Sequence, residues 1–420
     1  MLTADNPPRY YLPRELLDSI FIHLDKPDLS TCTILCCHFH ISARALLFLR
    51  INLIARGAVL SLTEYLSRFR AFLMGQPSVA CWVKKLRIAV KYSIDQPYET
   101  IHHCDISTLL RLLPSLQTLE LCEIEIQASP VDGACHKPIS LHRLSLNGVT
   151  FSLSSSYDHT ALIGTDNRSE GSLVQFFNLF GFVDHLYVLI QFTEEREDPG
   201  VEAYINQNSY DRIKRQGRLL SDAFRVKRVT ATWEDGCDRS YKVFWLFGGS
   251  RVQDDLQCLE LDDCLWNIRY GLEQQVFKSL QHLHLRFTEF ETYGDLETSK
   301  FNLPACPTLT CLLLDMRDAD LDDSDAGSLP LCLHLVRQLP PTTQRLSFKL
   351  NFLESHHSNI WREDSQGEQW LATDTFLASH AGLQKINFVF DYDGTMDVGG
   401  LVKVNLPRAQ AAKTLNIWTQ

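Results

Sequence analysis

The chain has 420 residues, of which 45% are hydrophobic, 22% are charged and 10% are aromatic. That balance is typical of a folded globular protein and excludes a mainly disordered chain or a coiled-coil rod. The net charge of −11 argues against a broad basic face for nucleic acid, because an acidic chain repels phosphate backbones. The length predicts two or three structural units unless the chain is built from repeats.

The start of the chain and its thirteen cysteines indicate a compartment. Residues 1–9 are polar and contain two prolines, unlike the apolar core of a signal peptide, and we expect them to be a flexible N-terminus. The cysteines have no compact spacing, so they are expected to be reduced thiols. No stretch approaches the roughly 18 apolar residues of a membrane span. We therefore expect a cytoplasmic or nuclear protein that binds no membrane.

Residues 12–53 carry the strongest local signal. Pro13 suits the first turn of a helix, where its missing N–H costs nothing. Residues 26–28 then end this first helix and begin a second, and a third apolar pattern follows. So small a bundle cannot hide all of these apolar faces, which predicts a partner that covers the remainder. In the first helix, one apolar face is formed by Leu16, Leu17, Ile20, Phe21 and Leu24.

The segment resembles the F-box family, whose members begin LP-x-E-L-L-x-x-I-F-x-x-L, continue D-L-x-x-C and end V-C-x-x-W. The chain matches the start in full and the middle at residues 28–32, but Phe39 stands where Trp is usual. The resemblance implies docking on a Skp-type adaptor, which bridges to a cullin–RING ubiquitin ligase. An ordinary helical hairpin that caps the following residues is the alternative. By resemblance, the residues that face the adaptor are Leu12, Pro13, Leu16, Leu17, Ile20, Phe21, Leu24 and Leu29.

After residue 80 the sequence repeats a short pattern, apolar-x-x-apolar-x-apolar. LQTLEL, LHRLSL and LQHLHL are clear copies, and the spacing between copies ranges from 24 to 43 residues. The last two apolar positions alternate as in a strand. Helical patterns lie between copies at 106–113, 172–182, 331–339 and 374–381. The central apolar residues of the eleven copies are Leu86, Leu119, Leu144, Leu186, Val229, Leu259, Leu283, Leu312, Leu346, Ile386 and Leu415.

One strand and one helix per copy is the signature of a leucine-rich repeat. The ragged spacing is similar to that of the large fungal F-box families. We therefore expect an α/β chain, in which a short three-helix F-box precedes an irregular leucine-rich-repeat solenoid with a parallel sheet on its concave face. A compact α/β domain with parallel strands is the alternative. The predicted boundaries are 10–55 for the F-box, 56–82 for a helical linker or cap, and 83–420 for the repeats.

Three polar segments interrupt the repeats. Residues 152–169 are Ser-rich and predict a loop, and residues 315–325 contain six Asp and predict an acidic loop. Residues 193–216 are highly charged and predict an excursion or an exposed helix.

The neighbours of the repeat leucines are expected to point to the concave face, because side chains alternate along a strand. Charges of both signs there suit a protein client rather than a polyanion. The resemblance thus predicts a substrate-recognition subunit of a Skp–cullin–F-box ubiquitin ligase. An F-box-containing repeat scaffold outside a ligase is the alternative, and for any single residue a merely solvated strand face is the alternative. The predicted client-binding residues are Glu120, Arg143, Tyr187, Arg228, Glu260, His282, His284, Arg286, Arg345, Lys349 and Lys385.

One local pattern points to catalysis. Residues 388–395, FVFDYDGT, resemble the first motif of haloacid-dehalogenase-like phosphatases, in which Asp391 would be the nucleophile and Asp393 the general acid/base. That chemistry also needs a later lysine and further acidic Mg²⁺ ligands, and only 25 residues without an acidic pair follow Thr395. We therefore expect that the chain is not an enzyme and that it binds no cofactor.

Metal-binding patterns are equally incomplete. Asp318, Asp320 and Asp322 have calcium-loop spacing, but the positions that need Gly and Glu are Asp323 and Leu329. The cysteines and histidines of residues 32–40 have no second ligand pair at zinc-finger spacing. The adjacent pairs at 102–103 and 356–357 chelate poorly, because neighbouring side chains point apart. We expect no metal site.

Overall fold

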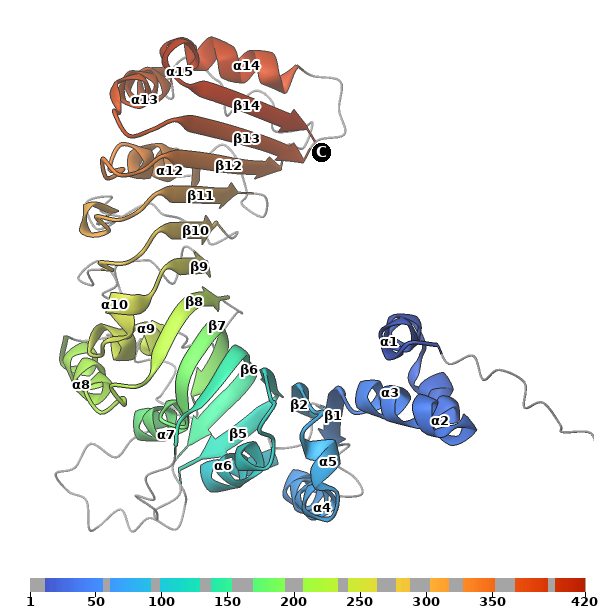
Figure 1. Ribbon diagram of the computed structural model, residues 1–420. Helices are drawn as coiled ribbons and strands as arrows, with labels where there is room; N and C mark the ends of the chain where they lie inside the picture. Colours follow the sequence, from blue (N-terminus) through green and yellow to red (C-terminus); the bar gives the residue numbers. More distant parts are fainter. Residues whose placement is uncertain are drawn as a thin grey trace, which may run out of the picture. The chain divides into compact units, whose positions relative to one another are not determined.

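The chain folds as an α/β protein in two compact units, Met1–Glu125 (unit 1) and Ile126–Gln420 (unit 2) (Figure 1). The predicted boundaries at 55 and 82 do not coincide with this division. The computed structural model describes residues 12–55, 61–91, 99–128, 137–152, 169–192, 207–232, 241–262, 277–287, 303–316, 328–351, 367–391 and 397–419.

Unit 1 begins with three short helices, α1 (Arg14–Phe21), α2 (Lys26–Leu35) and α3 (Cys37–Leu47). Asp25 caps α2, because its carboxylate accepts a hydrogen bond from the backbone N–H of Asp28 at 2.8 Å. The core of this bundle contains the aromatic pair Phe21 and Phe39, whose rings meet edge to face 5.2 Å apart. Phe39 therefore fills an aromatic position of the bundle core. The fully buried members of the core are Leu17, Phe21, Leu29 and Ala43.

A strand that the sequence analysis did not predict follows these helices. β1 (Arg50–Ala55) pairs in parallel with β2 (Lys85–Val90), although residues 10–55 were expected to form an F-box of three short helices. β2 pairs in turn with β4 (Thr118–Cys122). Residues 48–53, FLRINL, are a further copy of the repeat motif, and Ile51 of β1 is the Cα partner of the central residue Leu86 of β2. The remaining elements of unit 1 are α4 (Leu62–Gly75), α5 (Pro77–Ala80), β3 (Glu99–His102) and α6 (His103–Arg111), and β5 (Ile124–Gln127) crosses the boundary.

Unit 2 is built on a long parallel sheet. Among the described residues nine strands pair in chain order, each with the next. They are β6 (Ile139–Ser152), β7 (Phe180–Phe192), β8 (Arg225–Ala231), β9 (Cys258–Asp262), β10 (His282–Arg286), β11 (Cys311–Met316), β12 (Arg345–Asn351), β13 (Lys385–Asp391) and β14 (Thr414–Thr419).

The repeat motif sets the register of these strands. Leu144 is the Cα partner of Leu186, and Leu186 is the Cα partner of Val229. The central residues of all the following strands are paired in the same way, up to Leu415. All eleven predicted central residues lie in strands, two of them in unit 1. Those from Leu144 to Ile386 are buried, so this side of the sheet forms the core.

Helices gather along one side of the strands of unit 2 (left in Figure 1). Three of the four predicted helical patterns fall here, and the predicted helix 172–182 ends earlier, because β7 begins at Phe180. The expected helix 106–113 corresponds to α6 of unit 1. The helices of unit 2 are α7 (Ser169–Phe177), α8 (Gln207–Gly217), α9 (Tyr241–Gly248), α10 (Val252–Asp255), α12 (Ser328–Val336), α13 (Gly367–Ser379), α14 (Val398–Asn405) and α15 (Pro407–Ala412), with a 3-10 turn at Leu303–Ala305.

The three interrupting segments are described only in part. α8 occupies the end of the predicted segment 193–216, which favours the helical alternative for that part. Residues 153–168, 193–206 and 317–327 lie outside the described residues. In the described parts of the chain, no helix is both long and apolar enough to cross a membrane.

Candidate functional site

The first candidate surface is the outer side of α1. Leu16 and Ile20 lie one turn apart on α1 and are 51% and 50% exposed, and Leu12, just before the helix, is 51% exposed. A separate open hollow of about 590 Å³ lies beside α1, and its mixed lining includes Arg14, Asp18 and Trp82 but none of the three residues Leu12, Leu16 and Ile20. The apolar side of α1 is therefore defined by the exposed Leu16 and Ile20.

Three of the predicted adaptor-facing residues belong to the core instead. Leu17, Phe21 and Leu29 are only 3%, 3% and 5% exposed, because Leu17 and Phe21 of α1 and Leu29 of α2 belong to the core that the three helices enclose. Leu24 is half-buried against the same core, whereas Pro13 is exposed. The expectation that the buried three contact a partner is corrected: they hold the bundle together.

The second candidate surface is the face of the unit 2 sheet opposite the buried leucines. The matched register sorts its side chains into three rows that cross the strands. The basic row takes, from each strand, the residue immediately before the central motif residue, and it consists of Arg143, His185, Arg228, Cys258, His282, Cys311, Arg345 and Lys385. The middle row takes the residue immediately after the central motif residue and includes Tyr187, Thr230, Glu260, His284, Leu313 and Ser347. The outer row contains Asp262, Arg286, Asp315 and Lys349.

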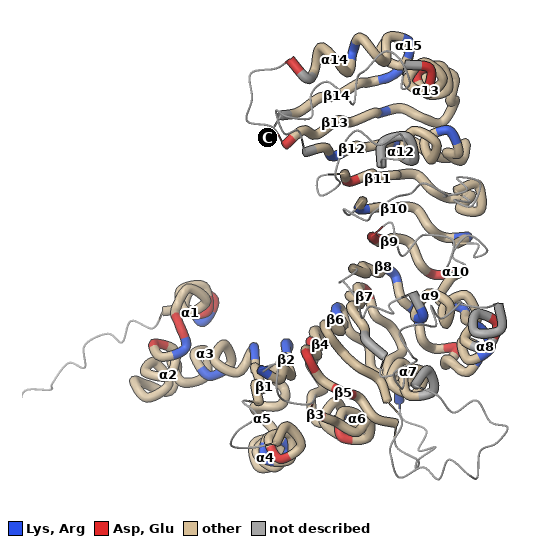
Figure 2. The backbone as a smooth tube through the Cα atoms, turned by 180° about the vertical axis from the view of Figure 1, so that it is seen from behind, with Lys and Arg blue, Asp and Glu red and all other residues tan. Residues whose placement is uncertain are grey.

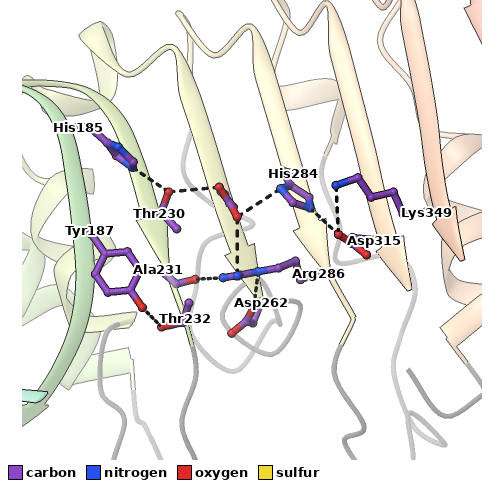
Figure 3. Close-up of polar contacts among 11 residues, drawn as sticks. His185, Tyr187, Thr230, Ala231, Thr232, Asp262, His284, Arg286, Asp315 and Lys349 are labelled. Atoms are coloured by element: carbon purple, nitrogen blue, oxygen red, sulfur yellow. Dashed lines mark hydrogen bonds and ion pairs between the residues drawn. The ribbon is translucent and has the colours of Figure 1, made fainter. Parts of the chain in front are cut away.

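Polar contacts link the middle and outer rows across four strands, β9 to β12 (Figure 3). The imidazole of His284 lies between two carboxylates, with Nδ1 3.4 Å from Glu260 Oε1 and Nε2 3.3 Å from Asp315 Oδ2. Arg286 places Nε 2.9 Å from Asp262 Oδ1 and Nη1 3.7 Å from Glu260 Oε1. Lys349 Nζ lies 3.6 Å from the buried Asp315.

Neutral donors extend this network toward β7 (Figure 3). The hydroxyl of Thr230 donates to Glu260 Oε2 at 3.3 Å and lies 3.0 Å from His185 Nε2. The phenol oxygen of Tyr187 lies 3.1 Å from the hydroxyl of Thr232. The carboxylates of this face are therefore already paired within the chain.

The network shifts the titration of its members. Burial lowers the pKa of His284, but hydrogen bonds and charge from Asp315 and Glu260 outweigh that effect and raise it above the ordinary value. The hydrogen bond from His284 is the largest influence on Glu260 and holds the pKa of this carboxyl below its usual range, against desolvation. The pair is therefore stabilised in its charged form.

The basic row has a different character. It contains no carboxylate, and only Arg228 makes an ion pair among the described residues, with Asp184. Burial, followed by the charges of Arg143 and Arg228, lowers the pKa of His185. An open hollow of about 370 Å³ lies over the centre of this row, where Cys258, His282 and Cys311 occupy neighbouring strands.

The predicted client-binding residues thus gather on one face, apart from Glu120, which lies on β4 of unit 1. The sequence analysis missed four residues of this face, His185, Asp184, Cys258 and Cys311. The signal for three of them was present, because they occupy the same motif position as Arg143 and Arg345. Asp184 carries no such signal, and only its contact with Arg228 identifies it.

The enzyme and metal patterns are placed as follows. Asp391 is the exposed last residue of β13, whereas Asp393, Asp318, Asp320 and Asp322 lie outside the described residues. His102 ends β3 and His103 begins α6. Within the described ranges, no three His, Cys, Asp or Glu side chains are arranged to hold a metal ion.

In comparisons with known proteins, no protein-family profile matches this chain and no curated protein matches it.

Proposed function

We propose that this chain is a substrate-recognition subunit of a Skp–cullin–F-box ubiquitin ligase. The observation that carries the proposal is the exposed apolar stripe formed by Leu16 and Ile20 of α1 and by Leu12 just before it, in a segment whose sequence resembles the F-box pattern. An exposed stripe of large apolar side chains is costly in water unless a partner covers it. In the proposal the Skp-type adaptor is that partner.

The register of the unit 2 sheet supports the second half of the proposal. Central motif residues align from strand to strand, as expected if each copy is one irregular leucine-rich repeat. Repeats of this kind present an extended face of strands, and here that face carries the basic, middle and outer rows. We infer that a client protein binds there.

The proposed mechanism is proximity. Adaptor docking through α1 and client binding through unit 2 bring lysines of the client near the ubiquitin-charged enzyme that the ligase recruits. This raises the effective concentration of the reacting groups, and the chain itself lowers no chemical barrier.

Co-purification with a Skp-type adaptor tests the docking surface. Leu16→Asp and Ile20→Asp each place a charge in the proposed apolar contact, and we expect at least a tenfold loss of captured adaptor. Leu371→Asp is the matched control, because Leu371 is an equally exposed leucine on α13 of unit 2. Equal adaptor capture by all three variants would refute the docking assignment.

A second measurement separates a ligase subunit from a scaffold that acts outside a ligase. If the adaptor complex also contains a cullin, and if Ile20→Asp abolishes ubiquitination of a co-purified client, the ligase function is supported. Adaptor binding without a cullin would favour the scaffold.

A further inference from the structure

Charges on the polar face of unit 2 alternate in the sequence but are separated in the fold. The position before each central motif residue is Arg, Lys or His in six of the eight strands from β6 to β13, and it is never Asp or Glu. The matched register brings these positions into the basic row, while the acidic residues of the face fall in the other two rows. Figure 2 shows how the charged residues are distributed along the strands.

The two sets of charges are compensated to different degrees. Glu260, Asp262 and Asp315 are all held by cationic side chains of the middle and outer rows. In contrast, among the described residues Arg143, Arg345 and Lys385 make no ion pair, although all three are exposed. A protein whose net charge is −11 therefore presents three uncompensated cationic side chains in one row of this face.

The arrangement of this row is unfavourable without an anion. Arg345 and Lys385 are direct Cα partners on neighbouring parallel strands, and Arg143 and Arg228 flank His185 in the same way. Like charges directly opposite one another on a sheet destabilise it. Burial is the main cause of the lowered pKa of His185, and the charges of Arg143 and Arg228 add to it. A bound anionic ligand would relieve this repulsion.

We propose that the basic row binds an acidic segment of the client protein, an extended peptide whose Asp and Glu side chains pair with Arg143, Arg345 and Lys385. This inference rests on the client-binding half of the proposed function. The hollow of about 370 Å³ in the middle of the row receives one side chain of the same segment, over the thiols of Cys258 and Cys311.

The dimensions of the row fit such a ligand. From Arg143 on β6 to Lys385 on β13 there are seven strand intervals. At about 4.8 Å each they span roughly 34 Å, which is the length of about ten residues of extended chain. The anionic segment is thus expected to be about ten residues long.

Fluorescence polarisation with the full-length chain tests the proposal. The probe is a labelled ten-residue peptide of alternating Glu and Thr, and the matching Gln/Thr peptide is the uncharged control. We expect the Glu/Thr peptide to bind and the Gln/Thr peptide to bind at least tenfold more weakly. This measurement does not involve the adaptor. Failure of the Glu/Thr peptide to bind would therefore leave the docking half of the proposed function intact, and failure of adaptor docking would leave the peptide result intact.

Charge-reversal variants locate the site. Arg345→Glu combined with Lys385→Glu is expected to weaken binding of the Glu/Thr peptide at least tenfold, and the double change to Gln is expected to have a smaller effect. Arg218→Glu combined with Arg337→Glu is the control, since it alters the net charge equally at exposed residues beside α8 and α12. Circular dichroism confirms that each variant is folded.

Three outcomes would overturn the proposal. The first is absence of binding by the Glu/Thr peptide. The second is equal weakening by the control double variant, which would mean that the attraction is not located at the basic row. The third is equally tight binding of a ten-nucleotide oligothymidylate, which would indicate a site for polyanions in general rather than for an acidic peptide.

Discussion

At the scale of single residues, His284 makes the stability of unit 2 depend on pH. The pKa of His284 is raised in the folded state. Its contribution to the stability of unit 2 is therefore fully present below pH 6.5, the ordinary pKa, and is lost as the pH rises through the raised pKa. The pKa of Glu260 is lowered, so the contribution of its carboxylate to stability is present above pH 4.5, the ordinary pKa, and is lost as the pH falls through the lowered pKa. The pair therefore stabilises the fold most between pH 4.5 and 6.5.

We expect His284→Gln to lower the thermal midpoint more at about pH 5.5 than at about pH 8.5. His282→Gln is the matched control, because His282 lies on the same strand and makes no ion pair among the described residues. Thermal melts of the three proteins at both pH values measure the difference. If His284→Gln lowered the midpoint equally at both, the charged interactions of His284 would not contribute.

The division of α1 into a buried and an exposed side has a consequence for stability. Phe21→Ala removes a ring that packs against Phe39, and we expect it to lower the free energy of unfolding of the three-helix bundle by about 3–4 kcal/mol. Ile20→Ala, one residue earlier on the exposed side, is expected to change it by no more than about 0.5 kcal/mol. Urea unfolding monitored by circular dichroism compares the two, and similar losses would contradict the assignment of faces.

At the scale of elements, the packing of α8 against α9 depends on a glycine. A Cβ atom on Gly217 would overlap the carbonyl oxygen of Leu246, because the end of α8 closely approaches α9. We expect Gly217→Ala to destabilise unit 2 by about 1–3 kcal/mol through this overlap. Gly75→Ala at the end of α4 is the control, since no atom lies near its Cβ position, and it should be neutral. Denaturant titration of each variant measures the effect, and tolerance of Gly217→Ala would mean that the helices separate at low cost.

The elements also show which features sequence periodicity predicts. Eleven strand centres followed from the repeat motif alone, because apolar residues at fixed offsets must face one core. β1 was missed because its copy of the motif, FLRINL at residues 48–53, directly follows the apolar pattern assigned to the third helix, and only the pairing of Ile51 with Leu86 separates the two. The predicted helix 172–182 was too long, because Phe180 and Phe182 continue the apolar pattern into β7.

At the scale of the whole molecule, the two proposed binding surfaces lie on different units. We therefore expect them to be separable by mutation. Affinity purification of the full-length Leu16→Asp variant should lose adaptor peptides and keep client peptides, as judged by mass spectrometry. The Arg345→Glu, Lys385→Glu variant should keep the adaptor and lose clients. Joint loss of both sets of peptides in either folded variant would contradict the assignment of separate surfaces.

The sequence by itself determined the positions of the repeat strands and of three short helices, because both depend on local periodicity of apolar residues. It did not determine which side of α1 is buried, since Leu16, Leu17, Ile20 and Phe21 are all compatible with one wide apolar face. Packing against α2 and α3 selected Leu17 and Phe21 for the core. The separation of charges into rows was likewise decided only by the tertiary structure. Residues more than a hundred positions apart, such as Arg143 and Arg345, share a row because the register of the strands between them aligns them.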